Sequence, residues 1–386
     1  MVEMEGYKMK KKFVIAPDSF KGSLNCGEAA AAMERGLCRA FPGSEIVSLP
    51  VADGGEGTMD VIASILPGKK IKRTVSGPLL RPVEAAYFLG SDGTAVVELA
   101  QASGITLVER EKLNPFCTST LGTGELLRDA LDRGAKKIIL TLGGSATNDG
   151  GSGIARALGI RCRKENGKEV EPGCGGLGEA ADLDISGIHP GLASTPIEIA
   201  CDVSNPLCGP EGASAIFGPQ KGAALEDIPR LDALLQAYGT LLEQKSGRKL
   251  MDLPGTGAAG GAAMPLLAFG KAKIVSGIDT VLRLIGFEKA LENADAVLTG
   301  EGKIDGQTCF GKAIAGILSY TVPRRILTLG FAGMLEEGYE ALYDRGMTAC
   351  FAICPGPVKL EDAMKNAGLY LERAVYNAAR LMGKFS

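Results

Sequence analysis

Short apolar runs alternate with polar, glycine-rich loops and amphipathic segments along much of the chain. Near the N-terminus, the apolar runs KKFVIA (residues 11–16) and EIVSLPV (45–51) each lead into such a loop. Segments with helical periodicity follow at about 28–41 and 58–66, and Asn25 with Glu28 has capping-box spacing before the first. Strand, loop and helix repeated in this order predict a parallel, doubly wound α/β sheet.

The middle of the chain has a more mixed pattern. Strand-like runs occur at 71–77, 82–90 and 94–100 with no helix between them, which indicates antiparallel pairing. The last third returns to alternation. Further strands are expected at 136–142, 196–203, 294–300, 324–330 and 348–354, and further helices at 124–133, 228–245, after Gly311, at about 336–344 and at 360–381.

This order of elements predicts two domains, since 386 residues exceed what one hydrophobic core usually supports. We expect a Rossmann-like parallel-sheet domain built from both chain ends, residues 9–69 and 281–386. A mixed α/β domain, residues 70–280, is inserted between them, with an active-site cleft between the two domains.

Five charged or glycine-rich segments each directly follow an apolar strand. They are APDSFKG (16–22), VADGGEG (51–57), GGSATNDGG (143–151), CDVSNPL (201–207) and GEGKIDGQ (300–307). In open α/β sheets, ligands bind at the carboxyl ends of the strands, so we expect these segments to form one site. Glycine is also abundant, with 54 residues, and glycine-rich loops carrying Asp, Lys and Asn suit a phosphorylated, metal-bound ligand.

Two nucleotide-binding motifs match only in part. GQTCFGKA (306–313) fits G-x-x-x-x-G-K, but Ala313 replaces the hydroxyl residue that would hold magnesium. Either Lys312 and a helix N-terminus bind phosphate there, or the segment is a plain helix start. GTGAAG (255–260) fits the dinucleotide pattern but follows Asp252-Leu253-Pro254 rather than a strand.

The polar residues of these loops supply the candidate chemistry. Asp202, at a strand end, is the candidate general base, and Lys21 is a second candidate catalytic residue. Carboxylates that converge on one crevice favour magnesium, with Asp53, Asp149, Glu301 and Asp305 as candidate ligands. The candidate substrate- and ATP-binding residues are Asp18, Ser19, Gly54, Gly55, Gly144, Ser145, Asn148, Asn205, Lys221, Lys303, Gln307 and Lys312. A single Asp more often caps a turn or a helix, so the argument depends on their convergence.

Composition excludes several classes of protein. A net charge of −3 gives no basic footprint for nucleic acid, and no apolar run approaches a membrane span. The single histidine, His189, excludes a Ser–His or Cys–His nucleophilic site. Ten scattered cysteines without a C-x-x-C pair or a signal peptide indicate reduced thiols in the cytoplasm. We expect a monomer or a homodimer acting on small molecules.

The loop segments and their order resemble those of the bacterial glycerate kinase family, type 1. The matching segments run from about residue 13 to 312: IAPDSFKGSL, PVADGGEGT, TGELL, GGSATNDGG, CDVSNPL, FGPQKGA, GAAGG and TGEGKIDGQT–GK. The resemblance implies phosphorylation of D-glycerate by ATP with magnesium, usually to 2-phosphoglycerate. The motif positions that carry over are Asp18, Lys21, Asp53, Asn148, Asp149, Asp202, Asn205, Lys221, Glu301, Asp305 and Gln307. Lys303 departs from the family pattern, where many relatives have Arg, and Ile314 stands where relatives often have Pro.

Three alternatives stay open at this point. The same site could phosphorylate the 3-hydroxyl of glycerate. The chain could be an NAD-dependent hydroxy-acid oxidoreductase that uses GTGAAG, although no strand precedes that motif. It could also be a non-catalytic sensor of sugar acids or nucleotides.

Overall fold

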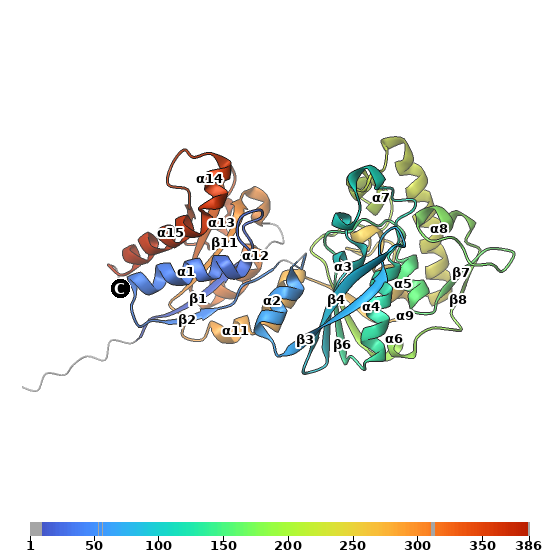
Figure 1. The fold of residues 1–386 in the computed structure, drawn as a ribbon, viewed down its shortest axis with the longest axis horizontal. Coiled ribbons are helices and arrows are strands. Elements are labelled where there is room, and N and C mark those ends of the chain that lie inside the picture. Colours follow the sequence, from blue (N-terminus) through green and yellow to red (C-terminus); the bar gives the residue numbers. More distant parts are fainter. Residues whose placement is uncertain (1–9, 53, 56, 310–312, 385–386) are drawn as a thin grey trace, which may run out of the picture. The chain divides into compact units, whose positions relative to one another are not determined.

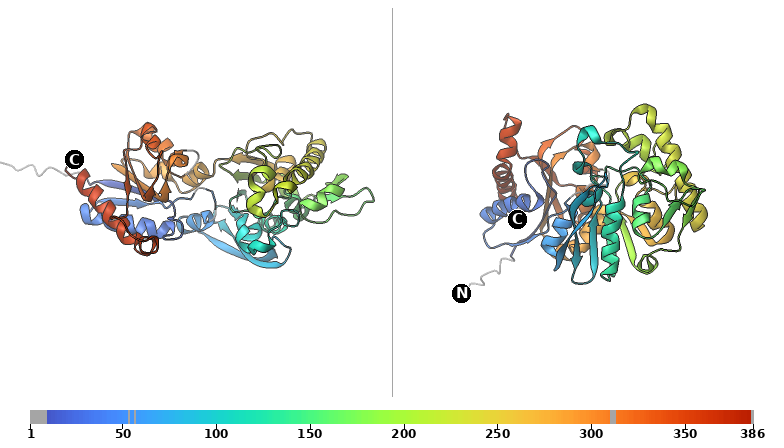
Figure 2. Two further views of the ribbon diagram at one scale, coloured as in Figure 1. Left: turned by 90° about the horizontal axis from the view of Figure 1, so that it is seen from above. Right: turned by 45° about the vertical axis from the view of Figure 1, so that its right-hand side comes forward.

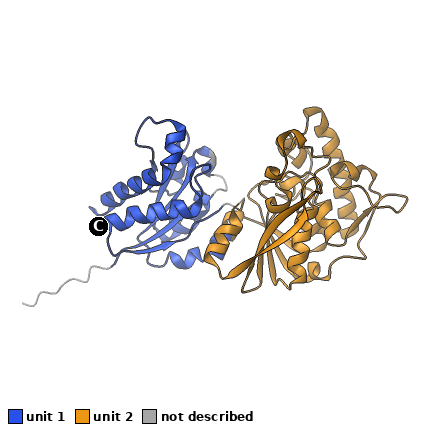
Figure 3. Cartoon of the chain, in the orientation of Figure 1, with its two compact units in different colours: residues 1–53, 281–386 blue, residues 54–280 orange. Residues whose placement is uncertain are grey.

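The chain folds into two compact α/β units in the computed structural model, which describes residues 10–52, 54–55, 57–309 and 313–384 (Figure 1). Unit 1 combines residues 1–53 and 281–386, and unit 2 is residues 54–280 (Figure 3). The predicted fold class is confirmed, because one unit holds a parallel sheet from both chain ends and the other a mixed sheet. None of the described helices has the length and hydropathy of a membrane span.

Within the described residues, unit 1 contains a five-stranded parallel sheet in the order β13-β12-β11-β1-β2. Its strands are β1 (Lys12–Pro17), β2 (Glu45–Ser48), β11 (Ala296–Ile304), β12 (Leu327–Leu335) and β13 (Ala349–Ala352). Pro17 lies opposite Gly300, so the carboxyl end of β1 adjoins the middle of β11. The loop that follows β1 therefore runs beside the second half of β11.

Two long helices, α1 (Cys26–Ala40) and α15 (Ala367–Met382), pack together against this sheet (Figures 1 and 2). The predicted capping box is present, because Asn25 Oδ1 accepts from Glu28 N and Glu28 Oε2 accepts from Asn25 N. Gly36 makes the close packing possible, since an added Cβ would lie 2.6 Å from the Glu372 carbonyl oxygen.

The other helices of unit 1 are shorter. They are α11 (Phe287–Ala290), α12 (Ala313–Thr321), α13 (Ala341–Asp344), α14 (Leu360–Lys365), η7 (Gly306–Cys309) and η8 (Val322–Arg324). The single helix expected at 360–381 is thus two, α14 and α15, which meet at Asn366. The helix expected at about 336–344 is only the short α13.

The described residues of unit 2 form a six-stranded sheet in the order β10-β9-β6-β5-β4-β3. Its strands are β3 (Gly68–Ser76), β4 (Pro82–Gly90), β5 (Thr94–Glu98), β6 (Lys137–Thr141), β9 (Pro196–Ala200) and β10 (Lys271–Val275). The antiparallel pairing of β3, β4 and β5 confirms the prediction, and β10 is a strand that the sequence pattern missed. Glu98, Thr141, Ala200 and Val275 form one row at the carboxyl ends of the parallel strands.

Helices and a small hairpin complete unit 2 around a core that includes Tyr87, Leu140 and Tyr238. The helices are α2 (Thr58–Ile65), α3 (Ala100–Ser103), α4 (Leu121–Asp132), α5 (Ser152–Ala157), α6 (Pro190–Ser194), α7 (Ala213–Phe217), α8 (Ile228–Ser246) and α9 (Met264–Phe269). The 3₁₀ segments are η1 (Ile105–Leu107), η2 (Arg110–Lys112), η3 (Cys174–Glu179), η4 (Pro219–Lys221), η5 (Leu225–Asp227) and η6 (Ala258–Gly260). Strands β7 (Arg161–Arg163) and β8 (Asp182–Asp184) make the hairpin.

The first division of the chain comes earlier than the sequence indicated. The inserted domain was expected to begin at residue 70, but unit 2 begins at Gly54. The reason is that α2 buries Met59, Val61 and Ile62 and contacts β3, β4 and β5. The second division, between residues 280 and 281, lies inside α10 (Gly277–Leu284).

Candidate functional site

The loops predicted to carry the chemistry form two clusters, one in each unit. The β11 cluster of unit 1 lies at the carboxyl ends of β1 and β11 and contains Asp18, Ser19, Lys21, Glu301, Lys303, Asp305 and Thr308. The β9 cluster of unit 2 lies at the carboxyl ends of β5, β6, β9 and β10. It contains Gly54, Glu98, Gly144, Ser145, Asp202 and Ser276.

In the β11 cluster, the loop after β1 is held against β11 through its backbone. Asp18 N donates to the Gly300 carbonyl at 2.9 Å, and Ser19 N donates to Asp18 Oδ1 at 2.6 Å. Gly302 permits the close approach, because a Cβ there would lie 3.2 Å from Lys21 N. The Lys21 side chain is exposed, so its ammonium is accessible to an anionic ligand.

Thr308 links the two acidic residues of this cluster. Its hydroxyl donates to Glu301 Oε1 at 2.8 Å and accepts from Asp305 N at 3.1 Å, while Thr308 N donates to Asp305 Oδ1 at 3.2 Å. Thr308 was not among the residues predicted from the sequence. A threonine three residues after Asp305 is an ordinary turn spacing and gives no signal of its own.

Lys303 lies between two carboxylates. Its Nζ is 2.9 Å from Glu336 Oε2 and 3.0 Å from Asp305 Oδ2. Hydrogen bonds to Glu336 and to Asp305 raise the pKa of the Lys303 ammonium, which therefore keeps its positive charge beside the acidic pair. A phosphate ligand would meet this charge at the edge of the cluster.

The β11 cluster has the carboxylates to hold magnesium together with substrate phosphates, but not by itself. Among the described residues, no group of three or more His, Cys, Asp or Glu could form a complete protein cage for a metal ion. Magnesium instead uses one or two carboxylates together with substrate phosphates, and Glu301 and Asp305 supply such a pair. Asp53, a further candidate ligand, lies outside the described residues.

In the β9 cluster, Asp202 is exposed and follows β9 directly. Its Oδ1 accepts from Gly277 N at 2.9 Å and from Ser276 Oγ at 3.0 Å. Gly54 packs against Gly277, because a Cβ at Gly54 would lie 2.9 Å from Gly277 Cα. The VADGGEG loop and the CDVSNPL loop therefore meet at the start of α10.

Glu98 is a member of this cluster that sequence reasoning missed. It ends β5 with 1% of its surface exposed, and its Oε1 accepts from Met59 N at 2.7 Å, at the N-terminus of α2. A buried carboxylate at a helix N-terminus is stabilised by the helix dipole and fixes the entry to that helix. The sequence does show a glutamate directly after the apolar run TAVV, and this position at a strand end could have indicated a site residue.

The GGSATNDGG loop divides into an exposed tip and a buried base. Gly144, with φ of 72°, is exposed, and Ser145 is almost buried. At the base, Asp149 is fully buried and accepts from Thr120 N, Thr120 Oγ1, Gly151 N and Gly153 N. These bonds argue against the metal-ligand role suggested for Asp149, and we assign it to the structure of the loop.

Three other candidates also support loops in this structure. Lys221 is 1% exposed, and its Nζ donates to the Thr147 carbonyl at 2.7 Å. Asn148 is buried, and its Nδ2 donates to Ser214 Oγ. Asn205 Nδ2 donates to the Glu211 carbonyl at 2.8 Å. Lys221 and Asn148 are thus buried beneath the loop tip, where these bonds support the loop.

The GTGAAG segment has a structural explanation as well. It follows a series of turns, and Gly260 packs so closely that a Cβ would lie 2.2 Å from the Thr147 carbonyl oxygen. This packing removes the main support for the dinucleotide interpretation. The Gln307 side chain and Lys312 are outside the described residues.

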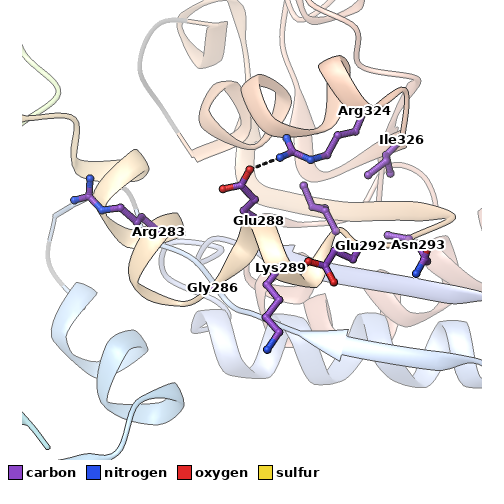
Figure 4. Close-up of a pocket in the computed structure, with 10 residues that line it drawn as sticks. Arg283, Gly286, Glu288, Lys289, Glu292, Asn293, Arg324 and Ile326 are labelled. Carbon is purple, nitrogen blue, oxygen red and sulfur yellow. Dashed lines mark hydrogen bonds and ion pairs between the residues drawn. The ribbon is translucent and has the colours of Figure 1, made fainter. Parts of the chain in front are cut away.

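The large pocket of unit 1, about 830 Å³, lies elsewhere (Figure 4). Its lining residues Asn293 and Ile326 come just before β11 and β12, so the pocket opens at the amino ends of these strands. Arg324 on its wall is paired with Glu288. The pocket is therefore at the end of the sheet opposite the β11 cluster, and we leave it out of the candidate site.

Comparison with known proteins decides the family. The sequence model of the glycerate kinase family matches residues 13–383 of this chain. The chain belongs to the glycerate kinase family. It is 46% identical to a glycerate kinase of Bacillus subtilis over 95% of this chain and 97% of that protein. It is 42% identical to a glycerate 2-kinase of Escherichia coli, over 95% and 97% of the two chains.

A solved structure of a candidate glycerate kinase 2 from Salmonella typhimurium LT2 has the same fold. Its TM-score to this chain is 0.88 at 42% identity, covering 97% of this chain and 99% of the other. Membership of the glycerate kinase family makes the chain an enzyme of the kinase type. The single histidine, His189, has structural contacts: its Nδ1 accepts from Gly191 N at the start of α6, and its Nε2 contacts Asp132.

Proposed function

We propose that this glycerate kinase family member transfers the γ-phosphoryl group of ATP to D-glycerate and forms 2-phosphoglycerate. The observation that carries the proposal is the pairing of Glu301 and Asp305 through Thr308, beside the positive charge of Lys303. Phosphoryl transfer depends mainly on positioning and on neutralising phosphate charge, which such a cluster provides. The name of the Escherichia coli relative, glycerate 2-kinase, supports the 2-hydroxyl as acceptor.

In this proposal the β11 cluster handles the phosphates. Lys21 and Lys303 contact phosphate oxygens, and Glu301 and Asp305 hold magnesium. Bound magnesium would neutralise charge on the phosphate groups as the bond to the leaving oxygen breaks. Asp18 and Ser19 shape the loop that presents Lys21.

The β9 cluster handles the acceptor. The glycerate hydroxyl oxygen attacks the γ-phosphorus, its proton passes to Asp202, and ADP leaves with the electron pair of the broken bond. Gly54 packs against Gly277, whose N–H donates to Asp202, and Gly144 follows β6, which pairs with β9. In this proposal the backbone of Gly54, Gly55 and Gly144 contacts the substrate. No nucleic acid, membrane or protein partner is required.

A coupled assay of ADP release tests the proposal. With the purified chain and magnesium, D-glycerate should stimulate ADP release from ATP, and removal of magnesium with EDTA should abolish it. NADH oxidation with hydroxypyruvate, without such ADP release, would favour the oxidoreductase. ATP binding without stimulation would favour the sensor.

The Asp202→Asn variant tests the assignment of the base. General-base catalysis typically contributes about 100-fold or more, so kcat should fall by at least that factor while the fold is kept. Circular dichroism and the melting temperature report on the fold. A fall of less than about tenfold in a folded variant would remove Asp202 from the role of base.

A further inference from the structure

Ser276 stands between Asp202 and helix α10. Its hydroxyl donates to Asp202 Oδ1 at 3.0 Å and accepts from Asp279 N at 3.3 Å. The second bond, together with its place directly before Gly277, gives Ser276 the geometry of a helix N-cap. One hydroxyl therefore joins the candidate base to the first turn of α10.

Gly277 N adds a second donor to the same carboxylate oxygen, at 2.9 Å. Two hydrogen bonds on Oδ1 fix the rotation of the Asp202 carboxylate, although the side chain is exposed. The β9–β10 pairing holds both partners in place, because Ala200 lies opposite Val275, just before Asp202 and Ser276 along their strands.

We propose that Ser276 is a positioning residue for the reaction, which orients Asp202 toward the substrate hydroxyl. The proposal rests on the proposed function, since it assumes that Asp202 is the base. Ser276 itself contacts neither the phosphates nor the reacting hydroxyl. Its effect on turnover passes through the carboxylate that it holds.

Three substitutions of Ser276 separate this role from plain helix capping. Ser276→Ala removes both the hydroxyl and the cap. Ser276→Gly removes the hydroxyl, but glycine caps a helix almost as well as serine does. Ser276→Thr keeps the hydroxyl and the cap. Ser194→Ala, at an exposed serine of α6 whose hydroxyl donates to the Gly191 carbonyl, is the matched control.

The experiment measures kcat, the KM for each substrate and the melting temperature of the full chain. Ser276→Ala and Ser276→Gly should both lower kcat about tenfold, because a misaligned base slows the chemical step. The KM for ATP should stay within about twofold, Ser276→Thr should keep most of the turnover, and Ser194→Ala should match the wild type.

The outcomes distinguish this inference from the proposed function. A wild-type chain without glycerate-dependent ADP release would overturn both. An active wild type with undiminished kcat in Ser276→Gly would overturn the positioning role alone. The same conclusion would follow if Ser276→Ala lost activity only in proportion to its lowered melting temperature.

Discussion

Lys221 and Asp149 are charged side chains in the interior of unit 2, beneath the GGSATNDGG loop. Burial lowers the pKa of Lys221 from its ordinary value of 10.5 to about 7, and the charge of Asp149 acts in the opposite direction. Burial raises the pKa of Asp149, while hydrogen bonds from Thr120, Gly153 and Gly151 oppose that rise. A buried lysine is costly, so its retention beneath this loop indicates a role in holding the Thr147 carbonyl.

Lys221→Met should lower kcat/KM by more than about tenfold, because the loop that carries Gly144 and Ser145 loses its internal support. The variant should also lose the part of the pH dependence of stability that Lys221 causes. Between pH 7 and 10.5 the unfolded chain keeps the Lys221 proton and the native chain does not, so wild-type stability gains with rising pH. Urea unfolding at several pH values in this window measures the difference between wild type and variant.

The free energy of unfolding of the wild type, minus that of Lys221→Met, should increase as pH rises from 7 to 10.5. The control is Lys249→Met, at an exposed lysine whose Nζ is 3.1 Å from the carboxylate of the buried Glu243. A difference that stayed constant with pH would contradict the buried position of Lys221.

The residue types of the site were predictable from the sequence, but their exposure was not. Asp202 and Lys303 lie where a ligand can reach them, as the strand-end rule implies. Asn148 and Asp149 share a loop with the exposed Gly144, and Lys221 ends η4, yet all three side chains are buried. A linear sequence shows which loop carries a polar side chain but does not show on which side of the backbone it lies.

At the scale of elements, the glycine-rich loops fall into two kinds. The GGSATNDGG loop ends a strand and exposes its tip, whereas the 255–261 loop packs beneath it. Gly150 N donates to the Gly260 carbonyl, and Ala259 has a φ of 49°, an unfavourable conformation for a residue with a side chain. Strain at Ala259 indicates that the packing of the two loops fixes this backbone.

Substitutions at adjacent positions test this support. Gly260→Ala should lower the free energy of unfolding by about 2 kcal/mol or more, since the new Cβ would clash with the Thr147 backbone. It should also lower kcat/KM, because the clash displaces the GGSATNDGG loop. Ala259→Gly, the matched control, should keep activity and lose no more than about 1 kcal/mol, as relief of strain offsets lost packing. Chemical denaturation and steady-state kinetics measure both. Full activity in Gly260→Ala would contradict the role of this loop.

Helices and strands with clear periodicity were predicted well, and those set by tertiary context were not. The capping box at Asn25 and Glu28 located the start of α1. Strand β10, KAKIV, was missed although Lys271 and Lys273 alternate with apolar residues, because five residues carry only a short alternation and no continuous apolar run. Its pairing with β9 decides the structure there, and that pairing also brings Ser276 to Asp202.

At the scale of the whole molecule, chain order alone indicated that both ends build one unit. The boundary after residue 69 was wrong, because α2 follows the same strand–loop–helix pattern as α1 but packs on the sheet of unit 2. Periodicity shows that a helix has an apolar face without showing which sheet covers it. No disulfide joins the described cysteines, in agreement with a fold held by hydrophobic cores in both units.

We propose that this molecule phosphorylates D-glycerate at its 2-hydroxyl. ³¹P NMR of the product formed from D-glycerate, ATP and magnesium tests the reaction and its position together. We expect a new phosphomonoester doublet, because the carbon that bears the phosphate carries one proton, and ADP should appear in equal amount. A triplet would show transfer to the 3-hydroxyl, and the absence of any phosphomonoester signal would contradict the kinase itself.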